Sequence, residues 1–132
     1  MKNALPIIII VVALCGAGIY FLSQSKENPS SPTLANQATG EPTLTIVRTD
    51  EGYEPSEVTI KKGDIILWTN ESSEYHWPAS DLHPTHGIYP EFDPRKPIAP
   101  GDEWSFKFDQ TGEWKFHDHL RANKIGTVTV TE

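Results

Sequence analysis

The sequence predicts an all-β protein, a β-sandwich, over residues 43–132. Short runs of apolar and β-branched residues recur roughly every 8 to 12 residues along this part of the chain. The whole chain has eleven prolines and nine glycines, a content that predicts turns and irregular loops. After residue 42 no segment keeps a helical period beyond about two turns, so no long helix is expected there.

The expected strands follow one another with turns between them. The segment 57–61 alternates apolar and polar residues, and the Lys62–Asp64 turn leads into a buried strand at 65–69. The segment 103–109 alternates three aromatic residues with polar ones, which is typical of a half-buried strand. The full set of expected strands is 43–47, 57–61, 65–69, 103–109, 113–116 and 127–131.

The segment 81–101 interrupts this pattern with five prolines and no strand period. An irregular excursion of about 20 residues inside a small domain is usually functional or disordered. Its apolar side chains could anchor it, and we therefore expect it to be ordered and to pack against one end of the sandwich. These side chains are Leu82, Ile88, Tyr89 and Phe92.

The first 22 residues predict a single N-terminal membrane anchor. Residues 4–22 carry no charge, and as a helix they would span about 28 Å, close to the hydrocarbon thickness of a bilayer. Lys2 precedes the run, which favours a cytoplasmic N-terminus and export of the remainder. The run continues past Cys15, and the bulky Leu14 precedes that residue, so an uncleaved span is favoured over a cleaved or lipidated form.

Three segments are therefore expected. Residues 1–22 are the membrane anchor, and residues 23–42, rich in Ser, Pro, Asn and Gln, are a flexible linker. Residues 43–132 form the folded domain. It would be tethered to the membrane on the extracytoplasmic side, either periplasmic or at the cell surface.

Charge and sulfur content exclude several functions. The net charge of −7 argues against a nucleic-acid partner, because such binding depends on clustered basic residues. Cys15 is the only cysteine and Met1 the only methionine. No disulfide forms within the chain, and the folded domain has no thiolate to offer a metal.

All five histidines fall in two short segments and form the candidate site. His117 and His119 end a strand, where residues two apart point to the same side about 6 to 7 Å apart. The preceding loop holds His83 and His86, and His76 opens it. A lone histidine is usually a hydrogen-bonded or surface residue, but two such pairs favour a metal site.

Imidazole nitrogen suits Cu(II), Zn(II) and Ni(II), and raw affinity favours copper. We expect His83, His86, His117 and His119 to be ligands first, with His76 as a fifth candidate. Copper is the expected metal and zinc the alternative. A carboxylate could orient a ligand ring from behind. The candidates for this role are Asp81, Asp93 and Asp118.

The order of several motifs resembles the cupredoxins. The similar segments are Tyr53–Pro55, Val58–Ile60, Lys62–Asp64, Trp68–Asn70, His76, Pro100–Gly101, Gly112–Phe116 and Gly126–Val130. The resemblance covers about residues 43–132 and implies a Greek-key sandwich that binds copper outside the cytoplasm. It also implies that His76 occupies the position of the family's first copper ligand.

The chain departs from that family at the other ligands. The position of the family's cysteine ligand falls on Asp118, that of its second histidine falls near Arg121, and no methionine follows. Without a thiolate there is no blue copper site. The segment from Trp114 to His119 is similar to a multicopper oxidase motif. That copper cluster needs two domains and a blue site, so the resemblance does not imply oxidase activity.

These features lead to one main hypothesis and two alternatives. The main hypothesis is a membrane-tethered, copper-binding cupredoxin-like protein with a histidine-rich, non-blue site for copper handling or redox. A type 2 copper oxidoreductase ranks lower, because the sequence indicates neither a second metal site nor a substrate pocket. A metal-free β-sandwich that acts as an interaction module is the third possibility. The sequence indicates a metal ion and a membrane as partners but does not identify a protein partner.

Overall fold

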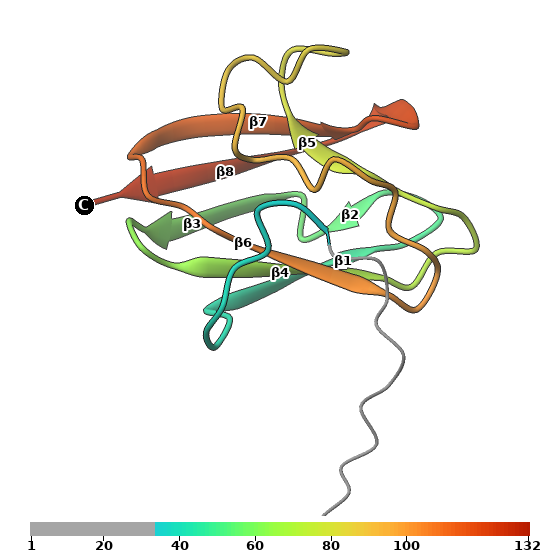
Figure 1. Cartoon of the computed structure of the whole chain (residues 1–132), viewed down its shortest axis with the longest axis horizontal. Helices are drawn as coiled ribbons and strands as arrows, with labels where there is room; N and C mark the ends of the chain where they lie inside the picture. The colour runs from blue at the N-terminus through green and yellow to red at the C-terminus, as the bar shows by residue number, and fades with distance from the viewer. Residues whose placement is uncertain (1–33) are drawn as a thin grey trace, which may run out of the picture. The chain divides into compact units, whose positions relative to one another are not determined.

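The structure is a computed structural model that describes residues 34–132, which fold into two facing β-sheets (Figure 1). One sheet has the strand order β2-β1-β4-β6 and the other β3-β8-β7-β5. The strands are β1 Leu44–Arg48, β2 Tyr53–Glu54, β3 Glu57–Lys61, β4 Ile65–Asn70, β5 Pro78–Ser80, β6 Glu103–Lys107, β7 Gly112–Asp118 and β8 Arg121–Thr131. The expected all-β sandwich is confirmed.

Each sheet combines parallel and antiparallel pairs. β1 lies parallel to β4, and β3 lies parallel to β8, while β4 pairs with β6 and β7 with β8 in antiparallel register. In the second sheet the short β5 pairs with β7, and Ala79 lies opposite His117. This pairing matters for the site, because β5 begins beside the end of β7, and the chain leaving β5 enters the loop 81–101 beside Phe116 and Lys115.

The core between the sheets is largely aromatic. Trp68 and Trp104 face each other in the register of β4 and β6, both are fully buried, and their ring centroids lie 5.3 Å apart. Phe116 from β7 packs against the edge of Trp68 at 6.0 Å. Aromatic pairs of this kind contribute about 0.5–1.5 kcal/mol beyond the area they bury. These contacts connect the two sheets.

The proline-rich loop 81–101 is ordered and rises above β5 and β7 (Figure 1). Tyr89 and Phe92 are buried in the core, where Phe92 lies 5.2 Å from the ring of Trp68. Leu82 and Ile88, which we expected to help anchor the loop, are instead 61% and 52% exposed. They belong to a tight turn that is closed by its own backbone hydrogen bonds, so the turn is held without burying their side chains.

Most strand positions agree with the sequence pattern, and the differences lie at strand ends and in two short strands. β6 ends at Lys107, although Phe108 beyond it remains fully buried. β8 begins at Arg121, six residues before the apolar alternation starts at Thr127. The two-residue β2 and three-residue β5 were not expected, because segments this short carry no readable period.

Part of the expected linker packs against the sandwich. Ala38 donates a backbone hydrogen bond to Ser105, and Ala35 accepts one from the indole of Trp104. Leu34 also contacts the core. Residues 34–38 therefore belong to the packed domain. The expected membrane anchor lies outside the described residues, and within residues 34–132 no helix is long and apolar enough to cross a membrane.

Candidate metal centre

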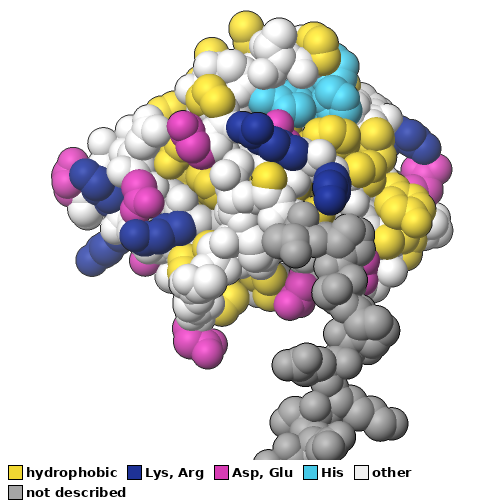
Figure 2. Space-filling model, viewed as in Figure 1, with side chains coloured by type: hydrophobic (Ala, Val, Ile, Leu, Met, Phe, Trp, Pro, Cys, Tyr) yellow, Lys and Arg dark blue, Asp and Glu magenta, His cyan; other side chains and the backbone are white. Residues whose placement is uncertain are grey.

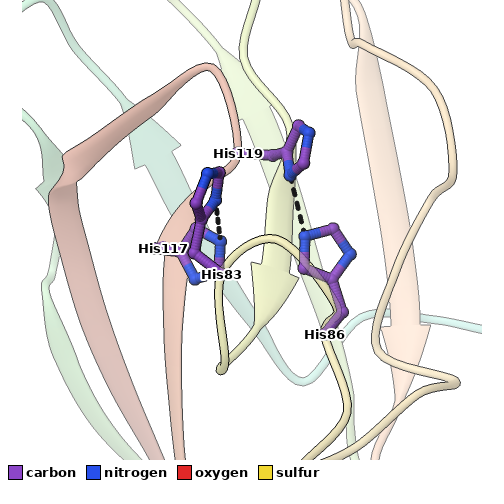
Figure 3. A group of neighbouring side chains, drawn as sticks. All are labelled: His83, His86, His117 and His119. Carbon is purple, nitrogen blue, oxygen red and sulfur yellow. Dashed lines mark hydrogen bonds between the residues drawn. The ribbon is translucent and has the colours of Figure 1, made fainter.

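Four histidines from two distant parts of the chain meet at one end of the sandwich (Figure 3). Each offers one nitrogen atom to the group, and these four nitrogens all lie within 4.8 Å of one another. The group consists of His83 and His86 from the loop, with His117 and His119 from the end of β7. The convergence on which the metal hypothesis depends is therefore present.

The end of β7 positions the first pair. The ladder between β7 and β8 is irregular at His117 and Asp118. His119 follows the strand, and its backbone N–H donates to the carbonyl of Trp77 at 2.8 Å. Asp118, between the two histidines, is fully buried. It forms an ion pair with Arg48, whereas the imidazoles on either side of it join the group.

A tight turn in the loop positions the second pair. The backbone N–H of His86 donates to the carbonyl of Leu82 at 2.6 Å, and that of Ile88 donates to Asp81 at 2.8 Å. His86 has a φ of +53°, in the left-handed region that costs a non-glycine residue roughly 1–2 kcal/mol. Strained backbone held in place by surrounding contacts is typical of functional sites.

Two aspartates hold two of the rings from behind. Asp81 Oδ1 lies 2.9 Å from Nδ1 of His117, and Asp93 Oδ2 lies 2.8 Å from Nδ1 of His86. A carboxylate accepts, so each Nδ1 carries the proton and each Nε2 keeps its lone pair toward the group. Carboxylates that fix the tautomer and orientation of a ligand imidazole are usual around protein-bound metals.

The other two histidines complete the set of nitrogens. Nδ1 of His83 lies 3.2 Å from Nε2 of His117, and Nδ1 of His119 lies 2.9 Å from Nε2 of His86. With metal–nitrogen bonds of about 2.0–2.1 Å, neighbouring ligand nitrogens lie about 2.9 Å apart in a square and about 3.3 Å apart in a tetrahedron. The four imidazoles therefore fit one metal ion without a large rearrangement.

Trp77 connects two of the four histidines. Its ring lies over that of His119, with centroids 4.6 Å apart, and its indole Nε1 donates to Asp93 Oδ1 at 2.7 Å. Asp93 in turn holds His86. Trp77 is only partly buried, and it borders the metal centre.

The electrostatics of the group favour a neutral imidazole at His119. Burial and the neighbouring imidazoles His86, His83 and His117 hold the pKa of His119 below its ordinary value. Burial alone would raise the pKa of Asp93, but hydrogen bonds from His86, Trp77 and Arg95 lower it below the ordinary range. A charged carboxylate at Asp93 and an uncharged imidazole at His119 suit a cation, because neutral imidazole is the form that binds a metal.

His76 is the one histidine outside the group. It is fully buried, pairs with Ile98 in an isolated β-bridge, and places Nδ1 3.4 Å from the hydroxyl of Tyr53. Its Nε2 is buried without a hydrogen-bond partner in the described structure. The sequence placed all five histidines at one end of the domain, but the structure brings four of them together.

Asp118, the third carboxylate considered as a support for a ligand ring, has a different role. Its Oδ2 lies 3.5 Å from Nε of Arg48, and its Oδ1 accepts the backbone N–H groups of Trp77 and Leu120, each at 3.0 Å. The sequence analysis did not single out Arg48. The sequence did contain a sign that Arg48 is buried. It lies two residues after Ile46, and alternate residues of β1 are buried on the same face.

Protonation of His76 is expected to make stability depend on pH. Burial first, and then the charge of Arg48, lower the pKa of His76 to about 3. The unfolded chain takes up this proton near pH 6.5, so the stabilisation is complete above that pH and is lost as the pH falls toward 3. The free energy of unfolding should drop by about 2.5 kcal/mol from this group between pH 7 and pH 4.5.

Urea unfolding of the metal-free chain at several pH values measures this loss. The variant His76→Gln has no titrating group at the position and serves as the control. Its stability should change less steeply with pH than that of the wild type. Parallel pH profiles for the two proteins would show that His76 is not the group responsible.

Asp93 is expected to raise metal affinity without being a ligand. Replacing it with asparagine keeps the shape but removes the charge that holds His86, and it weakens the acceptor for the indole of Trp77. Loss of such a support usually costs about 10–100-fold in metal affinity. Copper titration of Asp93→Asn should show a decrease in that range, whereas Asp109→Asn, at an exposed position, should bind as the wild type does.

Two facing sheets with four imidazoles close together at one end are the features of a metal-binding β-sandwich domain. Comparison with known proteins supports this class. The family model for the cupredoxin-like domain matches residues 9–130. The chain therefore belongs to the cupredoxin-like family. The expected resemblance is confirmed.

Curated relatives and solved structures support the same assignment. The chain is 34% identical to a plastocyanin of Scenedesmus fuscus over 83 residues, covering 59% of this chain and 85% of that protein. It is 31% identical to a chloroplastic plastocyanin of Tetradesmus obliquus over 90 residues, but it spans only 57% of that protein's length and 59% of its own.

Two solved structures share the fold. A purple cupredoxin from Nitrosopumilus maritimus matches with a TM-score of 0.59 and 24% identity, over 67% of this chain and 99% of the other. An amicyanin variant, in a reduced Cu(I) form at pH 4, matches with a TM-score of 0.61 and 20% identity, over 78% and 95% of the two chains. At these identities the matches support the fold alone.

Proposed function

We propose that this chain is a membrane-tethered, extracytoplasmic copper-binding protein whose non-blue site handles copper. One observation carries the proposal: four imidazole nitrogens lie within 4.8 Å of one another. Carboxylates hold two of these rings from behind. Burying polar groups costs free energy, so apolar side chains at these positions would stabilise the fold better. The arrangement is therefore better explained by metal binding than by stability.

Copper is the metal that this donor set favours. An all-nitrogen set of imidazoles binds Cu(II) more tightly than the other divalent metals of the first transition series, in line with the general order of affinities. Zinc is the alternative, since four imidazoles can also surround Zn(II) in a tetrahedron.

The donor set argues against blue-copper electron transfer. The only cysteine of the sequence is Cys15, which lies outside the described residues, and the position expected for a ligand thiolate holds Asp118. The carboxylate of Asp118 is already paired with Arg48. We therefore assign the site to binding and passing on copper, with slow redox change as a secondary property.

The location outside the cytoplasm rests on the N-terminal segment. Residues 4–22 form an uncharged apolar run behind Lys2, with a length suited to one membrane span. A tethered domain outside the cytoplasm would bind copper ions before these ions enter the cell or after they are exported. Cell fractionation, with protease added to intact cells, tests this location through loss of the domain.

Two measurements on the full-length chain test the binding function. Elemental analysis of protein purified from its native membrane, without added metal, should find copper in excess over zinc. Titration with Cu(II), followed by electron paramagnetic resonance (EPR), should give one protein-bound signal with nitrogen ligands and without blue-site parameters. A spectrum that stays identical to that of free copper would overturn the proposal. Turnover of oxygen, superoxide or nitrite by the loaded protein would favour the oxidoreductase alternative.

A further inference from the structure

The four histidines of the metal centre are not held equally. His86 and His117 are 4% and 2% exposed, and each is fixed by a carboxylate. His119 is partly buried under the ring of Trp77, and its backbone is bonded to the same residue. Three ligands therefore form a rigid base.

His83 is the exception. It lies in the exposed run 82–85, between Asp81 and the buried His86. Within residues 34–132 its side chain makes one hydrogen bond, from Nδ1 to His117 inside the group itself. Figure 2 shows that histidine side chains reach the molecular surface, so the centre is open to solvent on one side. In the described part of the chain, no carboxylate or indole forms a hydrogen bond with His83.

We propose that His83 is the replaceable ligand of this site, and that an imidazole from outside, such as a histidine of an acceptor protein, can take its place. This inference rests on the proposed copper-binding function and extends it to the route of copper transfer. Within residues 34–132, removing His83 from the ligand set breaks no side-chain hydrogen bond outside the group. Removing His86 or His117 would leave a carboxylate without its partner.

The charge around the site favours a neutral nitrogen donor over an anionic one. Asp81 and Asp93 already place two carboxylates behind the ligands. With a divalent cation these charges balance, so a third negative group such as a thiolate would be repelled. An imidazole also matches the ring that it displaces. An acceptor histidine could therefore bind while three ligands stay in place.

Rescue by free imidazole tests this inference on the full-length chain. In His83→Gly the copper affinity should fall by about tenfold, and the EPR spectrum should change. Added imidazole should restore the wild-type spectrum. It should also recover at least about half of the decrease in the logarithm of the copper affinity. In His117→Gly the affinity should fall by on the order of 100-fold, and imidazole should not restore it, because that position is buried against Asp81.

A rate measurement on the wild type gives a second test that needs no variant. The rate of copper loss to a histidine-containing peptide should rise in proportion to peptide concentration, as expected for direct displacement. A rate that does not depend on the peptide would overturn the inference, as would equal imidazole rescue of both glycine variants or of neither. If the wild type held no copper at all, the proposed function itself would be wrong.

Discussion

Replacing His117 with alanine is expected to lower the affinity of the chain for Cu(II) by on the order of 100-fold or more. The side chain is 2% exposed and has two hydrogen-bond partners in the centre. Its Nε2 accepts a hydrogen bond from His83, and its Nδ1 donates one to Asp81. The substitution also removes the Nε2 lone pair that would bind the metal. Removing a supporting carboxylate alone usually costs about 10–100-fold, so removing the ligand should cost at least as much.

Competition between the protein and a chelator of known affinity measures this loss. Lys115→Ala is a matched control, because Lys115 is exposed and lies two residues earlier on the same strand. The control should bind copper as the wild type does. Wild-type affinity in His117→Ala would mean that copper binds elsewhere, and the four-histidine centre would have to be abandoned.

Two strands of the core could be predicted from alternation over at least five residues, and the strand at 65–69 from its continuous apolar run. The segment 57–61 and the aromatic alternation of 103–109 gave positions close to those of β3 and β6. β5 could not be predicted in the same way, since it has three residues and begins with Pro78. Its pairing with β7 nevertheless decides where the loop 81–101 begins.

The candidate site was predictable in its residues but not in its division of roles. The spacing of His117 and His119, with a second pair in the loop, indicated which imidazoles would meet. The place of His76 depends on its burial beside Tyr53, about which the sequence pattern carries no information. Likewise, Asp81, Asp93 and Asp118 are equivalent in the sequence, and only tertiary packing separates the two that hold ligands from the one that faces Arg48.

Replacing Arg48 with methionine is expected to destabilise the domain by about 3 kcal/mol. Arg48 is 1% exposed and its partner Asp118 is fully buried, so the substitution leaves a buried carboxylate without its counter-ion. Breaking a buried ion pair from one side usually costs about 3–5 kcal/mol. We expect the lower end, because the backbone N–H groups of Trp77 and Leu120 still bond to Asp118, and Nη1 of Arg48 has no partner to lose.

Urea unfolding of the metal-free chain, followed by tryptophan fluorescence, gives the change in free energy. The double variant Arg48→Met with Asp118→Asn completes a double-mutant cycle, because it removes both charges and keeps an oxygen for the two backbone N–H groups. It should regain most of the lost stability, since replacing both partners of a buried pair is often nearly neutral. A loss below about 1 kcal/mol in the single variant would show that the pair is not needed for stability.

The same cycle connects the buried pair to the metal centre. Asp118 lies between His117 and His119, and its bonds to Trp77 and Leu120 fix the chain on both sides of this segment. Copper affinity should therefore fall in the single variant and recover in the double variant, although neither position contacts the metal. Stability that recovers without affinity would mean that the charge of Asp118, and not its hydrogen bonds, tunes the site.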